Sequence, residues 1–143
     1  MCDNGMVLVV GNVVFTSEEL PVICAPNVRE VDHPGCVVVV SNEAEFPMIR
    51  RALALLINGD IPRRLPAERI GGIQLITCGR CGKNTVSITS DSGDTLTIAL
   101  NRPVLTLDGT CEPLESPVKR SGSDFTCMAG FAAGILLNRK GAP

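Results

Sequence analysis

The stretch Ile73–Leu100 reads IQLITCGRCGKNTVSITSDSGDTLTIAL, and the prediction of the fold depends on it more than on any other part of the chain. Apolar residues alternate with hydroxyl-bearing ones over Thr85–Thr89 and again over Thr95–Leu100. A period of two gives a strand one face in the core and one in solvent, which is typical of an antiparallel sheet. The sequence therefore predicts a hairpin with its tip at Thr77–Asn84 and a second turn at Asp91–Asp94.

Four further segments read as strands. The runs Met6–Val10 and Val13–Thr16 flank Gly11-Asn12, a pair that tolerates positive φ and therefore predicts a tight hairpin. Val22–Cys24 is a short apolar run that follows a proline. Cys36–Val40 is apolar at every position, which indicates a strand that is covered on both faces.

The first of two expected helices spans Pro47–Ile57. Pro47 suits the first helical position, where a missing N–H costs nothing, and a capping box from Asn42 to Glu45 is the alternative start. Asn58-Gly59 is the expected end, because glycine is the usual left-handed cap.

The second helix is expected to start at Ser123 or Asp124 and to run through Leu137. Gly130 and Gly134 lie four residues apart in it, and each costs about 1 kcal/mol relative to Ala in a helix interior. Close packing should compensate for this cost. It would be either packing of the helix on its own sheet or packing of two chains against each other.

Together these segments predict an α+β fold, in which two helices pack on a mostly antiparallel sheet of six or seven strands. We expect one globular domain over residues 1–143, with its core at about residues 6–138. A chain of this length buries roughly 68–70 % of its unfolded surface, which is enough for a stable core. Residues 60–72 form the longest predicted loop, and residues 108–122 are expected to be a surface connection.

The composition argues against several classes of partner. Aromatic residues make up 3 % of the chain, with no Trp and no Tyr, so few rings are available to stack on bases. The net charge of −2 gives no electrostatic reason to expect nucleic acid. The longest apolar run, Phe125–Leu137, has 13 residues, whereas a helix needs about 20 to cross a bilayer. We therefore expect neither a nucleic-acid partner nor a membrane.

Seven cysteines are present, and residues 1–4 lack the basic start of a secretory signal. An odd number of cysteines without such a signal favours a reducing compartment, with thiols that are free or bound to metal. The sequence therefore predicts a cytoplasmic protein.

Cys78 and Cys81 form the most closely spaced cysteine pair, in the pattern Cys-x-x-Cys-Gly. Two thiolates at this spacing on a turn can provide half of a tetrahedral zinc site, and the other half must come from elsewhere in the chain. His33 and Cys36 have a similar spacing and would complete a Cys₃His set. The sequence therefore predicts a zinc site made of Cys78, Cys81, His33 and Cys36.

This segment also allows interpretations other than a zinc site. Cys111 with Cys127 would give a Cys₄ set instead, and a glycine-rich turn with two incidental thiols would need no metal. A disulfide switch is a further alternative. It lacks the helix N-terminus that activates such thiols, because a strand is expected to follow, but Arg80 and Lys83 could still favour a thiolate. A phosphate loop fails, because Thr77 and Asn84 stand where the pattern requires Gly and Ser or Thr.

The basic residues gather in the middle of the chain. Residues 50–83 carry seven basic and two acidic residues, whereas residues 1–49 carry one arginine and seven acidic residues. The guanidinium groups of Arg63, Arg64 and Arg69 could hold a carboxylate or phosphate of an anionic ligand. Arg50 and Arg51 belong to the same candidate group, but adjacent residues of a helix point in different directions, so not all five arginines can converge. The other interpretation is a solvated surface on which the arginines form ion pairs with the acidic N-terminal part.

Two functions are compatible with these observations. The first is a small cytosolic binding or assembly module that acts through a protein partner or self-association, with zinc as a structural element. It is favoured because the chain has one histidine and no Gly-x-Ser-x-Gly motif. The second is a small cysteine- or metal-dependent enzyme, or a ligand-binding domain, acting on an anionic small molecule. It predicts that Arg63→Ala or Arg64→Ala weakens ligand binding and leaves the melting temperature nearly unchanged.

Overall fold

The computed structural model describes residues 5–13 and 20–137. Its elements, in chain order, are β1 (Met6–Val10), β2 (Val22–Ala25), β3 (Glu30–Asp32), β4 (Cys36–Val40), β5 (Met48–Arg51), β6 (Ala54–Asn58), α1 (Ala67–Ile70), β7 (Leu75–Cys78), β8 (Val86–Asp91), β9 (Thr95–Leu100), β10 (Val104–Thr106), β11 (Gly109–Cys111), β12 (Leu114–Lys119) and α2 (Asp124–Leu136).

Eight of the strands form one large sheet, in the order β12-β9-β8-β7-β6-β4-β1-β2. From β2 to β8 every neighbouring pair is parallel, and only β8–β9 and β9–β12 are antiparallel. The predicted fold class is therefore wrong. The sheet is mixed and mostly parallel, not a mostly antiparallel sheet of six or seven strands.

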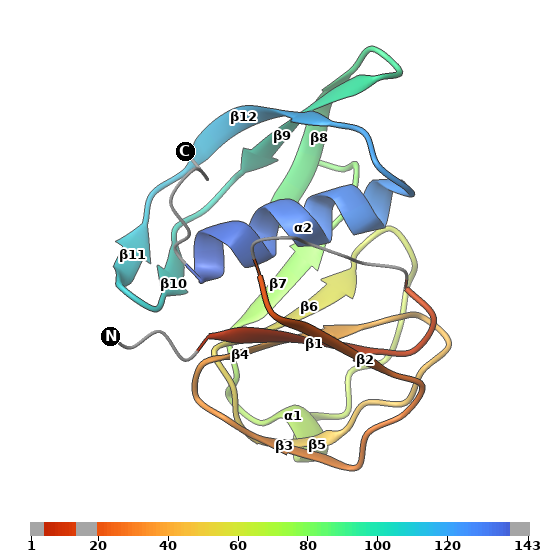
Figure 1. Cartoon of the computed structure of the whole chain (residues 1–143), viewed down its shortest axis with the longest axis vertical. Coiled ribbons are helices and arrows are strands. Elements are labelled where there is room, and N and C mark those ends of the chain that lie inside the picture. The colour runs from red at the N-terminus through yellow and green to blue at the C-terminus, as the bar shows by residue number, and fades with distance from the viewer. Residues whose placement is uncertain (1–4, 14–19, 138–143) are drawn as a thin grey trace.

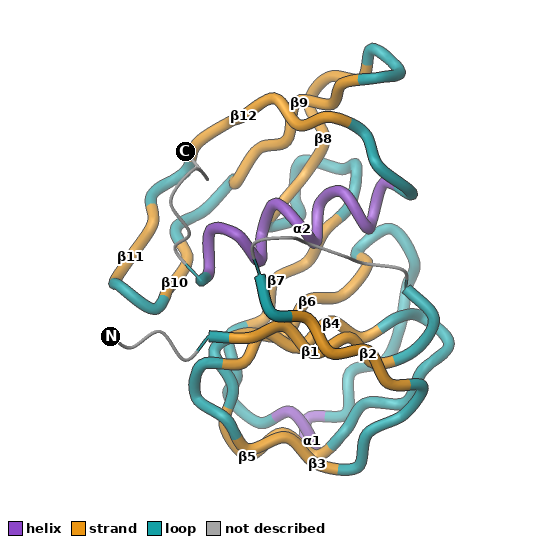
Figure 2. Tube along the Cα trace, in the orientation of Figure 1, coloured by secondary structure: helices purple, strands orange, loops and turns teal. Residues whose placement is uncertain are grey.

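Between β2 and β7 the chain winds in a β-solenoid-like coil (Figure 1). It passes alternately through the large sheet, as β2, β4, β6 and β7, and through a second layer made of β3, β5 and α1. In that layer β3 pairs with β5 in parallel, and α1 packs beside β5. Figure 2 shows the second layer below the large sheet, with α2 on the opposite face.

The side chains of β4 enter two separate cores, because successive residues of a strand point to opposite faces. Val37 and Val39 belong to the core under α2, whereas Cys36, Val38 and Val40 belong to the core between the two layers. All five are at most 1 % exposed. The prediction of a strand covered on both faces is confirmed, and its β-branched residues suit such a strand.

The C-terminal helix is also confirmed. Ser123 is the N-cap of α2, and its side chain accepts a hydrogen bond of 3.1 Å from the Thr126 N–H. Ala129, Ala132 and Ala133 are buried in the core under this helix, so its small residues let it lie close to the sheet. Gly130 and Gly134 themselves are half-buried, so the close packing expected to compensate for them stays a prediction.

The predicted helix over Pro47–Ile57 is wrong, because this segment forms β5 and β6. Ala54–Ile57 is a continuous apolar run, and such a run suits a buried helix and a buried strand equally well when periodicity is the only guide. In the structure β6 lies between β4 and β7, and all four of these residues are buried. The neighbouring strands therefore decide its conformation.

The predicted hairpin with its tip at Thr77–Asn84 is wrong as well. β7 and β8 are parallel and pair only where Cys78 meets Val86. The turn at Asp91–Asp94 is confirmed, because β8 and β9 are antiparallel on either side of it.

Two further expectations concern the ends of the sheet. Residues 108–122 are not a plain surface connection, because they contain β11 and the edge strand β12. Pro117 lies in β12, and an edge strand tolerates a residue that cannot donate to the ladder. The expected hairpin of Met6–Val10 with Val13–Thr16 lies partly outside the described residues, and both edges of β1 are paired with β2 and β4.

Candidate functional site

The carboxyl ends of β1, β2 and β4 meet at one edge of the large sheet, because these three strands are parallel neighbours. This edge lies on the right in Figure 1. The loops that leave it include residues 26–29 after β2 and residues 41–47 after β4. Ligands commonly bind outside the carboxyl ends of the strands in parallel sheets, so this edge is the first place to expect a binding site.

The loop of residues 41–47 is held in place by its first residues. The Ser41 N–H donates to the Val10 carbonyl over 3.0 Å, and Ser41 Oγ donates to Glu43 Oε2 over 2.6 Å. The Asn12 N–H donates to the same carboxylate oxygen over 2.7 Å. These hydrogen bonds, that of Ser41 above all, hold the pKa of Glu43 below its ordinary value. The loop is therefore tied to the end of β1.

Arg63 fixes the rest of this loop. Its guanidinium group donates to the Ser41 carbonyl over 2.7 Å and also to the Ala44 carbonyl. It lies over the ring of Phe46, 4.3 Å from the ring centroid, in a cation–π contact. Phe46 itself is buried in the core between the two layers. Arg63 is thus a half-buried structural residue, and its donors are engaged by protein carbonyls.

Two adjoining hollows lie around this loop. The first, here called the arginine pocket, has a volume of about 250 Å³ and is lined by Glu45, Phe46, Arg63, Arg64, Pro66, Glu68 and Arg69.

The second hollow, here called the loop pocket, has a volume of about 670 Å³. Its charged lining residues are Arg29, Arg69, Glu43 and Glu45, and the remainder of its wall is Pro26, Asn27, Val28, Ala44 and Phe46. Glu45, Phe46 and Arg69 line both hollows, so these side chains form a wall that the two share.

The arginines of the two hollows differ from the other arginines in the described part of the chain. Arg50, Arg51, Arg80 and Arg120 form ion pairs, and Arg63 and Arg102 donate to backbone carbonyls. Arg29 and Arg64 make no side-chain hydrogen bond or ion pair with any described residue. Arg69 makes one long hydrogen bond, of 3.5 Å, to the Phe46 carbonyl. Among the described residues, the arginines without an ion pair or a short side-chain hydrogen bond are therefore Arg29, Arg64 and Arg69, here called the unused arginines, and all three line these hollows.

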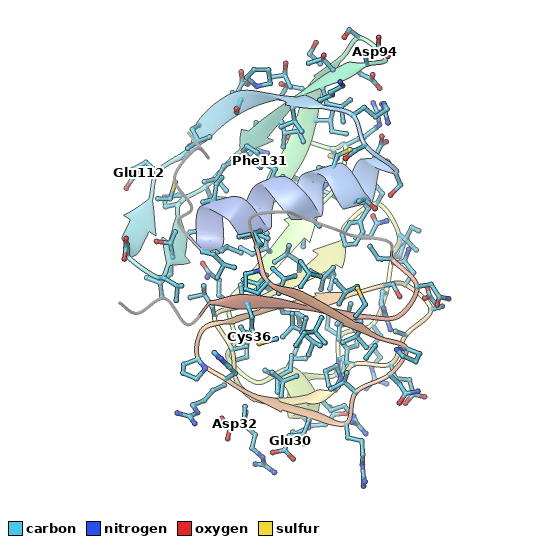
Figure 3. The ribbon with its side chains drawn as sticks, in the orientation of Figure 1. Glu30, Asp32, Cys36, Asp94, Glu112 and Phe131 are labelled. Carbon is cyan, nitrogen blue, oxygen red and sulfur yellow. The ribbon has the colours of Figure 1, made fainter. Side chains whose placement is uncertain are left out.

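The structure brings together the three arginines that the sequence singled out, because Arg63, Arg64 and Arg69 line one pocket. Arg50 and Arg51 point elsewhere. They form ion pairs of 2.6 Å with Glu30 and Asp32, as the solvated-surface interpretation expected for them. These two carboxylates lie on the outer side of the second layer in Figure 3.

The sequence analysis missed all the other lining residues, among them Arg29, Glu45 and Phe46. Arg29 precedes β3, and only the parallel pairing of β3 with β5 brings it near residues 45–48, as the hydrogen bond from the Met48 N–H to the Arg29 carbonyl shows. No local sequence pattern predicts a contact of this kind.

The two thiols of the Cys-x-x-Cys pair lie in different environments. Cys78 ends β7 and is fully buried in the core under α2, and this burial raises the pKa of its thiol strongly. Cys81 is exposed in the loop that follows. Asn84 is buried in that loop and donates to the Cys81 carbonyl over 2.9 Å, so the loop is held by an amide side chain.

His33 and Cys36 lie on a turn before β4. The Cys36 N–H donates to the His33 carbonyl over 3.1 Å, and the Gly35 N–H donates to His33 Nδ1 over 3.0 Å. The Cys36 side chain is buried in the core between the two layers (Figure 3), and burial raises the pKa of its thiol to about 11. Cys36 and Cys78 therefore belong to cores on opposite faces of the large sheet.

The described ranges contain no group of three or more His, Cys, Asp or Glu side chains placed to hold a metal ion. The four residues proposed as zinc ligands are thus not brought together here, and neither is the alternative set with Cys111 and Cys127. A zinc site stays a prediction from the sequence.

A network of four charges, which the sequence did not indicate, lies at the start of α2. Arg80 binds Asp124 over 2.7 Å and Asp91 over 2.8 Å. Arg120 binds the same two carboxylates over 3.1 Å and 2.9 Å. Hydrogen bonds from Arg80 first, then from the Gly93 N–H and from Arg120, lower the pKa of Asp91 to about 2. The network is balanced in charge and joins the loop after β7 to α2.

Comparisons with protein-family models, with curated proteins and with solved structures found no match to this chain. Over the described residues, no helix is both long enough and apolar enough to cross a membrane.

Proposed function

We propose that this chain is a ligand-binding domain whose ligand is an anionic small molecule held in the arginine pocket. The observation that carries the proposal is the position of the unused arginine donors. Arg64 has no partner among the described residues, Arg69 has one long hydrogen bond, and both line the same pocket. A planar guanidinium group offers a fork of donors that matches a carboxylate or a phosphate, so a small anion is the ligand that this lining suits.

Arg63 has a different part in this proposal. Its donors are engaged by the Ser41 and Ala44 carbonyls, so it shapes the wall of the pocket, and Arg64 and Arg69 supply the free donors. A volume of about 250 Å³ lies just below the range of roughly 300–1,000 Å³ that is common for ligand pockets, which favours a ligand of few atoms.

The proposed function is ligand binding and does not involve a nucleophilic cysteine. A nucleophilic cysteine needs an accessible thiolate, whereas Cys36 and Cys78 are buried and burial raises the pKa of both thiols. Cys81 is exposed, but it does not line either hollow.

Isothermal titration calorimetry with inorganic phosphate and with glutarate, at low ionic strength, tests the proposal. We expect at least one of the two anions to bind, and Arg64→Ala and Arg69→Ala each to weaken that binding about tenfold, as the loss of a charged hydrogen bond implies. Arg50→Ala is the matched control, because it removes the same charge from an ion pair with Glu30 outside both hollows. If neither anion binds, or if Arg50→Ala weakens binding as much as Arg64→Ala, the proposal is wrong.

A further inference from the structure

We infer that the anionic ligand also carries an ammonium group, as an acidic amino acid does. In this zwitterionic ligand a carboxylate is held by the unused arginines and the ammonium group by Glu45. This inference rests on the proposed function and specifies its ligand class. It follows from the carboxylate that lies where the two hollows meet.

Glu45 lines both the arginine pocket and the loop pocket. Its side chain is exposed and makes no hydrogen bond or ion pair with any residue that the structure describes. Arg69 lines the same two hollows but lies beyond ion-pair distance of it, since no salt bridge joins them. Glu45 and Arg69 therefore present opposite charges to the same hollows without forming an ion pair with each other.

The neighbouring carboxylate is different. Glu43 also lines the loop pocket, but its carboxylate already accepts hydrogen bonds from Ser41 Oγ and the Asn12 N–H. Glu43 is thus part of the frame of the loop. Of the two carboxylates that line the loop pocket, Glu45 is the one left for a ligand, and it also lines the arginine pocket together with Glu68.

The balance of charge around the loop pocket favours a ligand with both signs. Arg29 and Arg69 stand against Glu43 and Glu45 there. A simple anion that reached the shared wall would meet the unpaired carboxylate of Glu45, and a like charge next to a ligand group lowers affinity. An ammonium group of the ligand in that position is instead attracted to the Glu45 carboxylate.

The remaining wall suits the aliphatic part of such a ligand. Pro26, Val28 and Phe46 provide apolar surface in the loop pocket, whose volume of about 670 Å³ lies within the range common for small-molecule sites. The chemistry expected of the ligand is therefore a carboxylate, an ammonium group and a short aliphatic chain.

Calorimetric titration with glutarate and with L-glutamate tests the inference, because the two molecules share a five-carbon chain and two carboxylates and differ in the ammonium group. We expect the wild type to bind L-glutamate about fivefold more tightly, which is the effect of one ion pair at a partly exposed site. Glu45→Gln should remove this preference without weakening glutarate. Glu112→Gln is the control, because Glu112 lies far from both hollows (Figure 3) and should change neither affinity.

The outcomes separate this inference from the proposed function. Equal affinities for the two ligands in the wild type, or a preference for L-glutamate that survives in Glu45→Gln, would overturn the zwitterionic ligand and leave an anion site. If neither glutarate nor L-glutamate binds, the zwitterionic ligand is overturned as well. The titration with inorganic phosphate then shows whether the pocket binds an anion. A circular-dichroism melt of Glu45→Gln shows that the variant is folded.

Discussion

Arg63 and Arg64 are neighbours in the chain, and their guanidinium groups have opposite surroundings. Arg63 donates to two carbonyls of the loop of residues 41–47 and lies over Phe46. Arg64 is exposed and has no partner within the described part of the chain. The first is therefore expected to act on stability and the second on ligand binding.

Replacing Arg63 by Ala should lower the free energy of unfolding by about 1–3 kcal/mol, because two carbonyls lose a charged donor and Phe46 loses its cation–π contact. Arg64→Ala should change it by less than about 0.5 kcal/mol, as is usual for an exposed side chain. Urea denaturation of both variants provides the measurement. The contacts of Arg63 thus change the expectation from the sequence that both variants keep the wild-type melting temperature. Equal stabilities of the two would show that Arg63 does not hold the loop.

At the scale of single residues, the sequence indicates contacts that depend on local spacing. Arg63, Arg64 and Arg69 lie close together in the chain and line one pocket. The spacing of Cys78 and Cys81 suited a metal, but strand alternation competes with it. Ile76 and Cys78 share one face of β7 and both are buried in the core under α2. Burial of apolar surface, including the thiol, therefore directs Cys78 away from Cys81.

The ion-pair network at the start of α2 joins three elements that are distant in the sequence. Arg80 follows β7, Asp91 ends β8, and Arg120 and Asp124 flank the N-cap of the helix. Asp124 also lies in the first helical turn, where a negative charge interacts favourably with the helix dipole. The network should therefore stabilise this end of the molecule when both carboxylates are ionised.

This arrangement predicts a loss of stability in acid. The pKa of Asp91 is lowered from 3.8 to about 2 in the folded protein, and that of Asp124 is lowered as well. A lowered carboxyl pKa stabilises the fold above the unfolded value, and this contribution disappears as the pH falls through the folded value. The melting temperature of the wild type should therefore fall between about pH 4 and pH 2, and that of Asp91→Asn should fall less over the same range.

Asp94→Asn is the matched control for that measurement. Asp94 lies at the tip of the same hairpin (Figure 3), and its side chain takes no part in the ion pairs of the network. The variant should keep the pH dependence of the wild type. If Asp94→Asn and Asp91→Asn flatten the curve equally, the dependence comes from general surface charge and not from this network.

Elements with local start and stop signals are those that the sequence predicts well. The N-cap at Ser123 fixes the start of α2 through a hydrogen bond within four residues. Ala54–Ile57 has no such signal, and its partners in β4 and β7 lie outside the segment. The prediction of a hairpin tip at Thr77–Asn84 is wrong for a similar reason, because side chains distant in the sequence hold the backbone of this segment. Asp60 accepts from the Arg80 N–H over 3.0 Å, and Asn101 donates to the Asn84 carbonyl over 3.0 Å.

For the molecule as a whole, the direction of the strands is the property that local patterns do not reveal. A parallel pair needs a connection that returns the chain to the same end of the sheet. Here β3, β5 and α1 lie within those connections and cover the second face of the large sheet. Each of these two strands contributes few residues to the core between the layers: Val31 from β3 and Ile49 from β5. Neither strand therefore gives a clear strand pattern, and β5 falls within the helix predicted over Pro47–Ile57.

This two-sided covering of the large sheet predicts the cost of shortening neighbouring residues of β4. Val38 faces the core between the layers and Val39 faces the core under α2, and both are fully buried. Val38→Ala and Val39→Ala should each lower the free energy of unfolding by about 1–3 kcal/mol, because each leaves a cavity in a packed core. Val118→Ala in the edge strand β12 is the control and should cost less than about 1 kcal/mol, because Val118 is only half-buried. If only one face of the sheet were covered, one of the two β4 positions would tolerate alanine with little loss of stability. A loss in free energy of unfolding for Val38→Ala as small as that for Val118→Ala would therefore contradict the second layer.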